Sequence, residues 1–209
     1  NHSCGVYTLQ RGGVTWYFLE NDYYFGRREL YGHYDDGERF AFFCKAALDM
    51  LPALGWWPDV VHANDWQSAL VPIYLRTLYQ NDLRYAALRT VCTIHNIQYQ
   101  GAFSRDFLTD VAGIDDRYFQ NGELAWNEGV NLLKGAVLYS DAVTTVSPSY
   151  AGEIQTAYYA HGLDAVLRKR AEALSGVLNG IDPGDADPGN DPSLAARYGP
   201  ENLSGKREN

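Results

Sequence analysis

Short apolar runs alternate with stretches of helical periodicity along most of this chain. The runs are rich in β-branched and aromatic side chains and are bounded by polar residues, a pattern typical of buried strands. They predict strands at 14–19, 60–61, 90–94, 142–146 and 175–178. Residues 21–37 are rich in Gly, Tyr and Asp, so we expect a loop there.

Other segments carry their apolar residues on one helical face. They predict helices at 38–54, 66–79, 127–139, 147–158 and 163–173. Pro52 is expected to distort or end the last turn of the first helix. Ser147 before Pro148 is a favourable helix start, with serine as the N-cap and proline at the first helical position. Residues 98–123 form a long connection, which we expect to be functional or to carry small helices.

Strands that alternate with helices predict an α/β fold, in which a parallel sheet is covered by helices on both faces. At 209 residues the chain is long enough for a substantial core, and we expect one domain over 1–182. From Asp182 the composition shifts to Asp, Pro, Gly and Asn. Residues 183–209 are therefore expected to be a surface loop or linker.

Polar side chains follow two of the predicted central strands. His62 closes the Val60–Val61 run and precedes Asp65, while His95 and Asn96 follow the next strand. Open α/β sheets build ligand sites where strands deliver polar groups at their carboxyl ends. We therefore predict a crevice lined by these four polar residues.

Structural interpretations of the same residues remain open. His62 fits a hydrogen-bonded structural histidine as well as a substrate contact, and Asn64–Asp65 fits a helix cap. Lys134 lies on a predicted helix, where lysine is usually solvated and less often contacts a substrate. Asn179 before Gly180 is most simply a turn pair after a strand.

The charge and composition of the chain limit the classes of ligand that it is expected to bind. The net charge is −9 at pH 7, which argues against nucleic acid and anionic membrane surfaces, because both require a positive footprint. A neutral partner such as a sugar suits this charge, and the 16 Tyr and 5 Trp could stack on sugar rings, although aromatic residues also fill cores. No apolar run is long enough to span a membrane, and no signal peptide opens the chain.

The sequence lacks the motifs typical of metal sites, serine nucleophiles and nucleotide-binding loops. Cys4, Cys44 and Cys92 have no metal-ligand spacing, so we expect free thiols in a reducing compartment, with the last two buried. Neither His62 nor His95 has zinc-site partners at a helical spacing, so no metal is expected. The chain also lacks a Gly-x-Ser-x-Gly elbow, a Gly-x-Gly-x-x-Gly fingerprint and a Walker loop.

Taken together, several segments resemble bacterial glycogen synthase and plant starch synthase. Each segment alone is a weak signal, whereas their common order over nearly the whole chain is highly specific. The segments are Tyr23-Tyr24-Phe25-Gly26, Tyr31-Gly32-His33-Tyr34-Asp35-Asp36, His62-Ala63-Asn64-Asp65-Trp66, Thr93-Ile94-His95-Asn96 with Tyr99-Gln100-Gly101, Thr145-Val146-Ser147-Pro148-Ser149-Tyr150-Ala151 with Glu153-Ile154, and Val177-Leu178-Asn179-Gly180-Ile181-Asp182.

The resemblance implies a retaining glucosyltransferase of the GT-B fold, in which two Rossmann-like domains face each other across a cleft. ADP-glucose would give its glucosyl unit to the non-reducing 4-hydroxyl of an α-1,4-glucan, with no metal. By matching position, Asp65 corresponds to the family's active-site aspartate and His95 to the histidine that contacts the transferred glucose. The substrate-binding residues expected around them are His62, Trp66, Asn96, Tyr99, Lys134 and Asn179.

Departures from the family pattern imply a fragment. The Lys-Thr-Gly-Gly-Leu motif and the basic second domain are absent, and residues 183–187 replace the usual tryptophan-containing segment after Gly180. We therefore expect most of an N-terminal, acceptor-side domain, cut from a longer protein whose C-terminal domain is missing. We also expect it to be inactive alone, because the missing residues would clamp the diphosphate. The resemblance implies the bacterial cytoplasm, or the plastid for a plant protein.

Alternative functions remain open. The piece could act as a non-catalytic glucan-binding module, which binding of ADP by the piece alone would contradict. A nucleotide-dependent oxidoreductase on a similar sheet is disfavoured by the missing glycine fingerprint. Within the transferases, a sucrose-linked GT-B enzyme is the nearest rival, and the residues that distinguish ADP from UDP lie in the missing parts.

Overall fold

The structure is a computed structural model, and it describes residues 2–209. The chain divides into two compact units, with the boundary between Val177 and Leu178. Each unit is described by itself below.

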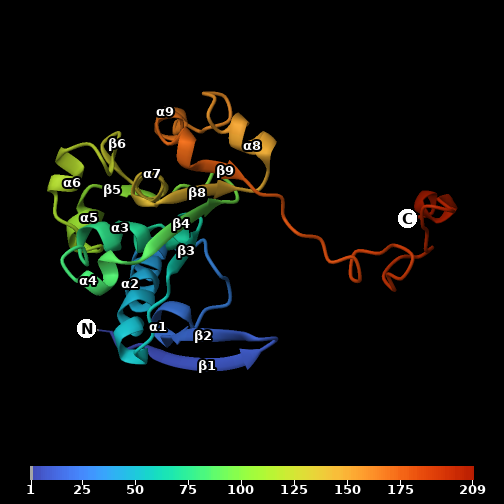
Figure 1. Cartoon of the computed structure of the whole chain (residues 1–209), viewed down its shortest axis with the longest axis horizontal. Helices are drawn as coiled ribbons and strands as arrows, with labels where there is room; N and C mark the ends of the chain where they lie inside the picture. Colours follow the sequence, from blue (N-terminus) through green and yellow to red (C-terminus); the bar gives the residue numbers. More distant parts are fainter. Residues whose placement is uncertain (1) are drawn as a thin grey trace. The chain divides into compact units, whose positions relative to one another are not determined.

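The first unit is built on a parallel sheet of four strands, β3 (Val60–Asn64), β4 (Arg89–Ile94), β8 (Ala142–Thr145) and β9 (Leu174–Gly176), in that order (Figure 1). Each strand pairs with its neighbour in parallel, which confirms the predicted parallel sheet of an α/β fold. The four strands also coincide with the four predicted runs after residue 60, with ends shifted by a few residues.

The two faces of this sheet differ in burial. On one face, the core residues Ala63, Cys92 and Val143 are at most 2% exposed. On the other face, His62 and Asn64 are exposed and Thr144 is half-buried. Because side chains alternate along a strand, the pattern leaves one polar sheet face in reach of solvent.

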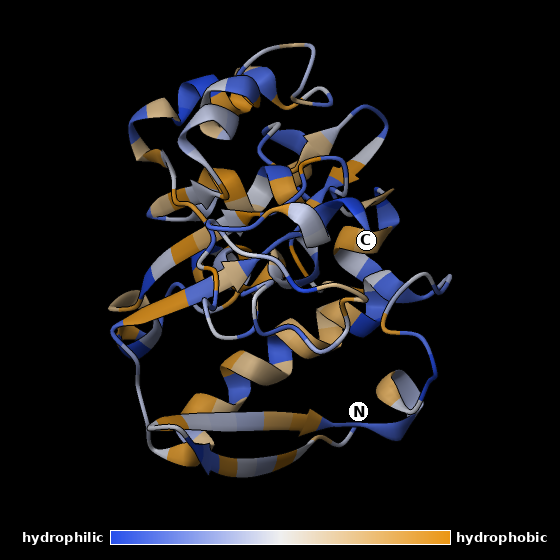
Figure 2. Cartoon of the chain, turned by 90° about the vertical axis from the view of Figure 1, so that its right-hand side faces the viewer, coloured by the Kyte–Doolittle hydropathy of each residue, from blue (hydrophilic) through white to orange (hydrophobic). Residues whose placement is uncertain are grey.

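Helices pack against the apolar face of the sheet. The longest, α2 (Asp36–Leu54), contacts α3 (Leu70–Thr77), which in turn contacts α7 (Leu132–Tyr139). Figure 2 shows hydrophobic and hydrophilic bands alternating along α2, as expected for a helix with one buried face. Pro52 does not stop this helix, which continues to Leu54 and ends at Gly55 in a left-handed conformation. The predicted helix 66–79 divides into a 3₁₀ turn, η1 (Trp66–Ser68), and α3.

An antiparallel hairpin of β1 (Gly5–Arg11) and β2 (Val14–Glu20) opens the chain. The strand predicted at 14–19 is confirmed, whereas its partner β1 was not predicted. The loop that follows contains α1 (Asp22–Phe25). This loop is held by Arg39, only 2% exposed, which forms an ion pair with Asp36 and donates a hydrogen bond to the carbonyl of Tyr24 at 2.8 Å.

The long connection after β4 does carry short elements, as predicted. After β4 come β5 (Ala102–Ser104), α5 (Asp106–Asp110), α6 (Arg117–Gln120), β6 (Ala125–Trp126) and β7 (Gly129–Asn131). A separate short helix, α4 (Leu83–Ala86), lies between α3 and β4. The three strands form a small antiparallel sheet in the order β5-β7-β6. The helix predicted from residue 127 therefore begins only at Leu132, because the residues before it pair with β5 and β6.

The remaining helices of the first unit are shorter than predicted. After β8 comes α8 (Pro148–Glu153), whose N-cap Ser147 accepts from the main-chain N–H of Tyr150, as the Ser-Pro pattern indicated. Then follow α9 (Asp164–Lys169) and η2 (Ala171–Ala173). Between residues 2 and 209, no helix is long and apolar enough to cross a membrane.

The second unit consists mainly of turns. Asp182, Asp187 and Asp191 each accept a hydrogen bond from a main-chain N–H two residues later, in the turn geometry typical of aspartate. A single bridge joins Gly199 and Asn202, and η3 (Ser204–Arg207) follows.

Candidate active site

The strands β3 and β4 end side by side. Asn64 at the end of β3 pairs with Thr93, and the main-chain N–H of Asp65 donates to the carbonyl of Thr93 at 2.9 Å. His95 follows one residue after β4 ends at Ile94. Asp65 and His95 therefore leave the sheet at the same edge, the carboxyl edge of two neighbouring parallel strands.

A direct hydrogen bond joins these two residues. The Oδ1 atom of Asp65 accepts from the main-chain N–H of His95 at 2.8 Å. Within residues 2–209, Oδ2 of this carboxylate has no hydrogen-bond partner. Asp65 occupies the N-cap position of η1, but its side chain makes no capping bond, so the interpretation of Asp65 as a side-chain helix cap is wrong. The reason is that its carboxylate is turned toward β4 instead.

The backbone of Asp65 is strained. Its φ of 56° and ψ of −171° lie in a region that is essentially restricted to glycine. Residues in such conformations cost about 1–3 kcal/mol and cluster at functional sites. The chain thus places a carboxylate where glycine would fit more easily, and this conformation directs the carboxylate toward His95.

Asn64 fixes the imidazole of His95 from the other side. Nε2 of His95 lies 3.0 Å from Oδ1 of Asn64. Because an amide oxygen only accepts, this bond requires a proton on Nε2, so that Nδ1 is the acceptor whenever the ring is neutral. Asn64 is itself held by Ser68, whose hydroxyl accepts from its N–H at 2.5 Å and donates to its carbonyl at 2.7 Å.

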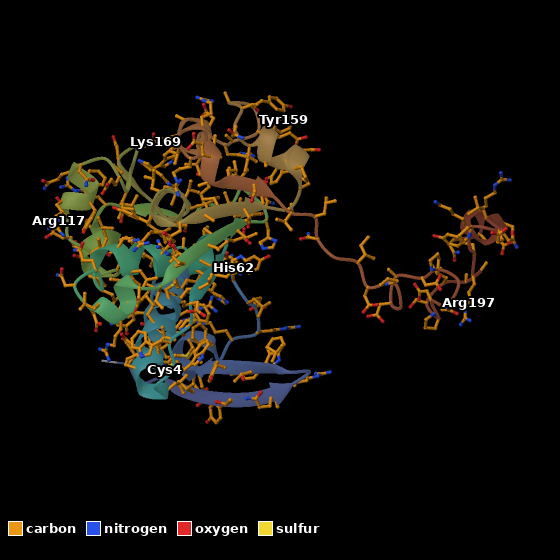
Figure 3. All side chains as sticks on the ribbon, in the orientation of Figure 1. Cys4, His62, Arg117, Tyr159, Lys169 and Arg197 are labelled. Carbon is orange, nitrogen blue, oxygen red and sulfur yellow. The ribbon has the colours of Figure 1, made fainter. Side chains whose placement is uncertain are left out.

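His62, labelled in Figure 3, bonds from β3 to the neighbouring strand of the sheet. Its Nε2 lies 2.5 Å from the hydroxyl of Thr93 on β4, which lies 2.6 Å from the hydroxyl of Thr144 on β8. These bonds support the structural interpretation of His62 and connect it to the middle of the exposed sheet face. Its role as a substrate contact stays a prediction.

Trp66 is half-buried and packs against two phenylalanine rings. Its ring centroid lies 5.2 Å from that of Phe40, with an interplanar angle of 83°, and 5.8 Å from that of Phe103. Gly101 sits directly against the same indole, where an added Cβ would come within 2.6 Å of the ring. Trp66 therefore anchors the segment that carries Asp65 to the loop that follows His95.

Asn96 and Tyr99 lie in a turn immediately after His95. The side chain of Asn96 accepts from the N–H of Gln98 at 3.0 Å, and its carbonyl accepts from the N–H of Tyr99 at 3.3 Å. Tyr99 is 58% exposed, so its ring is available to a ligand. The structure thus brings both predicted residues to the edge that carries Asp65 and His95.

Two predicted residues are not joined to this group. The ammonium of Lys134 donates to the carbonyls of Gly122 and Ala125 at 2.7 and 2.6 Å. Burial, with the nearby charge of Lys169, lowers the pKa of Lys134. Asn179 is exposed and belongs to the second unit. For both residues, a substrate contact stays a prediction.

Two residues of the site were not on the predicted list. Asn64 was part of the motif, and its place at the end of a strand is the same signal that singled out Asp65. Asn131 is fully buried, caps α7 through the N–H of Lys134 at 2.9 Å, and donates to Gln100 at 2.6 Å. Its pairing with the loop after β4 joins residues far apart in the sequence, which no local pattern reveals.

The thiols are free, as predicted, and Cys44 and Cys92 are buried. Burial raises the pKa of Cys92 to about 12, and the negative charge of Asp65 adds to the effect. Cys92 is therefore a protonated, inert packing group below the carboxyl edge. Among residues 2–209, no three His, Cys, Asp or Glu side chains are grouped so that they could hold a metal ion.

The chain as a whole is similar to starch and glycogen synthases. A family model described as "Starch synthase catalytic domain" matches residues 2–169. A glycogen synthase of Geobacillus thermodenitrificans is 51% identical over 195 residues, covering 93% of this chain and 40% of that protein. A glycogen synthase of Clostridium botulinum is 44% identical and is covered to 44% of its length.

Among solved structures, the catalytic domain of starch synthase IV from Arabidopsis thaliana, bound to ADP and acarbose, is similar with a TM-score of 0.85. It is 34% identical, and the match covers 99% of this chain and 43% of that one. The chain thus spans about two fifths of the length of the proteins that it matches.

Proposed function

Since the chain belongs to the family of starch synthase catalytic domains, we propose that it is part of a retaining glucosyltransferase that extends an α-1,4-glucan. The donor is ADP-glucose, and the glucosyl unit goes to the non-reducing 4-hydroxyl of the glucan. The chain contributes the acceptor-side domain of a GT-B enzyme.

One observation carries this proposal. Asp65 and His95 are joined at one edge of the sheet, and the carboxylate is held there at the cost of a strained backbone. Edges where parallel strands deliver polar groups are the usual ligand sites of open α/β sheets. Strain kept at such an edge supports a functional rather than a structural role for Asp65.

The two side chains would act by positioning and by charge. Retaining transfer passes through an oxocarbenium-like state, in which a nearby carboxylate stabilises the developing positive charge. The second oxygen of Asp65, which is not used within the described residues, can also orient an acceptor hydroxyl. His95, held by Asn64 with its proton on Nε2, can hold a sugar hydroxyl through Nδ1 or its carbonyl. We do not assign a covalent nucleophile.

The partners follow from the same proposal. ADP in the similar starch synthase structure supports ADP as the nucleotide of the donor. The diphosphate would be neutralised by a C-terminal domain, within the three fifths of the relatives that this chain does not match. The most similar relatives reported above are bacterial, which supports the bacterial cytoplasm over the plastid. His62, Trp66, Asn96, Tyr99, Lys134 and Asn179 remain proposed substrate-binding residues.

The experiment is a transfer assay on a polypeptide of the relatives' full length that contains this chain. Labelled ADP-glucose and UDP-glucose are offered with a maltooligosaccharide, and the anomer of the new linkage is determined by NMR. We expect an α-1,4 product from ADP-glucose. A β-linked product, or no transfer from either donor, would contradict the proposal. In parallel, residues 1–209 alone are expected to give no product, and robust synthesis by them would refute the role given to the remaining residues.

A further inference from the structure

The side chain of Gln100 joins three segments of the first unit. Its Nε2 donates to the carbonyl of Ile97 at 3.0 Å, in the turn after β4, and to the carbonyl of His161 at 3.2 Å, between α8 and α9. Its Oε1 accepts from Nδ2 of Asn131, the N-cap of α7, at 2.6 Å. Because main-chain carbonyls only accept, the amide has one orientation that satisfies all three bonds. Both donors and the oxygen of this amide are therefore used to hold segments that are far apart in the sequence.

The partner of Gln100 on α7 is fixed in the core. Asn131 is 0% exposed, its Oδ1 accepts from the N–H of Lys134 at 2.9 Å, and its own N–H donates to the carbonyl of Leu124 at 3.2 Å. The main-chain carbonyl of Gln100 also accepts from the N–H of Leu133 at 3.0 Å. Buried polar groups that are fully bonded specify one arrangement, so the start of α7 is a firm support for the turn.

The turn that Gln100 holds is the one that begins at His95. The N–H of His95 bonds Asp65. Two residues later, Ile97 is 1% exposed and its N–H donates to the hydroxyl of Tyr150 on α8 at 3.2 Å. The turn is thus anchored beyond His95 at two points, the hydroxyl of Tyr150 and the amide of Gln100. The position of His95 beside Asp65 depends on these anchors.

The third segment shares an unusual backbone feature with Asp65. His161 has a φ of 48°, a value that is uncommon for residues other than glycine. Among residues 2–209, the residues other than glycine with a positive φ are Asp65, Asn127 and His161. Two of these three bond the turn after β4, Asp65 through its carboxylate and His161 through its carbonyl. Unfavourable backbone on both sides of one turn supports a functional demand on the position of that turn.

We propose that Gln100 is a positioning residue of the candidate active site, which sets the place of His95 beside Asp65 by tying the turn to α7 and to the segment between α8 and α9. It acts through the turn and is assigned no contact with the substrate. The consequence for glucosyl transfer rests on the proposed function, since displacing a reacting group by about 1 Å costs on the order of 100-fold in rate. In the structural alternative, loss of Gln100 loosens the whole unit and not the turn in particular.

The first test measures amide hydrogen exchange by NMR in this chain. Gln100→Met keeps the length of the side chain and removes its three hydrogen bonds. We expect the N–H groups of His95 and Ile97 to exchange at least about fivefold faster, as for the loss of one hydrogen bond, while those of strand β8 keep their rates. Gln155→Met is the matched control, because Gln155 bonds the carbonyl of Ala151 on α8, and it should leave the turn unchanged. Equal acceleration in β8, or none in the turn, would overturn the proposal.

The second test measures transfer in a polypeptide of the relatives' full length that contains this chain. Gln100→Met should lower kcat about tenfold or more and change KM by less than about threefold, because the turn is displaced from the transition state more than from the bound substrate. Gln155→Met should change kcat by less than about twofold, since it leaves the turn in place. An unchanged kcat in Gln100→Met, or an equal loss in Gln155→Met, would overturn the positioning role.

A second substitution keeps the proposal testable if Gln100→Met fails to fold by circular dichroism. Gln100→Glu retains the acceptor for Asn131 but places a carboxylate oxygen against the carbonyls of Ile97 and His161. It should therefore speed exchange in the turn and lower kcat in the same direction, and wild-type values in both would overturn the proposal. No transfer by the wild type would refute the proposed function, whereas the exchange rates would still decide whether Gln100 holds the turn.

Discussion

The carboxylate of Asp65 accepts a hydrogen bond from the main-chain N–H of His95 at 2.8 Å, across two neighbouring parallel strands. The bond joins the residue after β3 to the residue after β4, and the same Asp65 has a positive φ of 56°. The position of the carboxylate and the strain of the backbone therefore occur in one residue, Asp65, and substitutions at this residue can separate them.

Replacing Asp65 by glycine should relieve the strain that alanine retains. Both variants lose the bond to His95, but only glycine adopts φ 56° and ψ −171° without cost. We expect Asp65→Gly to be more stable than Asp65→Ala by about 1–3 kcal/mol. Urea unfolding of the two variants measures the difference directly. Equal midpoints would show that the backbone is not strained.

Asn64 should set the tautomer of His95. In the wild type, the bond to Oδ1 of Asn64 keeps the proton on Nε2. Asn64→Ala removes that acceptor, so we expect the ¹⁵N shifts of the His95 ring to move toward a mixture of both tautomers at neutral pH. Asn96→Ala is the control, because its side chain bonds Gln98 instead. Unchanged ring shifts in Asn64→Ala would disprove the positioning role.

Gly101 should tolerate no side chain. Its φ is +62°, and an added Cβ would lie 2.6 Å from the Trp66 ring. Gly113 has a similar φ of +66° but open space around it. Gly101→Ala should therefore destabilise the protein by more than Gly113→Ala, which bears only the left-handed cost of about 1 kcal/mol. Thermal unfolding compares them, and equal losses would rule out a tight contact with Trp66.

Asp141 should make the protein sensitive to acid. Burial acts to raise the pKa of this carboxyl, but hydrogen bonds from the N–H and hydroxyl of Thr90 at 2.7 and 2.9 Å, with Arg76 and Arg89, outweigh it and hold the pKa below its usual range. A depressed pKa in the folded state gives stability that is present above the unfolded value of about 4 and is lost as pH falls toward the folded value.

We therefore expect Asp141→Asn to cost about 1–3 kcal/mol at pH 7, the range for a charged hydrogen-bonded group. The gap to the wild type should narrow as pH falls below about 4. Urea unfolding at a series of pH values measures this, with Asp59→Asn, which is exposed, as the control. A gap that stays constant down to pH 2 would contradict the assignment.

The sequence was sufficient for the parallel sheet, because β3, β4 and β8 are short β-branched runs and segments of helical periodicity lie between them. It was also sufficient to place Asp65 and His95 together, since neighbouring parallel strands share a carboxyl edge. It failed where pairing is long-range. Val130 looks like part of a helical face, but β7 pairs with β5 across the loop.

Strand β1 is a different kind of failure, because its signal was present. The β1 segment Gly5–Arg11 is joined by the pair Gly12–Gly13 to the strand predicted at 14–19. A glycine pair between two strand-like segments is typical of a hairpin. The bond of the Asp65 carboxylate to His95 could not be predicted, because an aspartate before a helix normally caps that helix. Its strained backbone appears only in three dimensions.

The most direct test of the account is the turnover number of glucosyl transfer after Asp65→Ala and His95→Ala, in the full-length polypeptide that contains this chain. Because both groups are proposed to act on transition-state charge and position, each change should lower kcat by about a hundredfold or more while the fold is kept. A loss of less than tenfold in both variants would contradict the assignment of this edge as the active site.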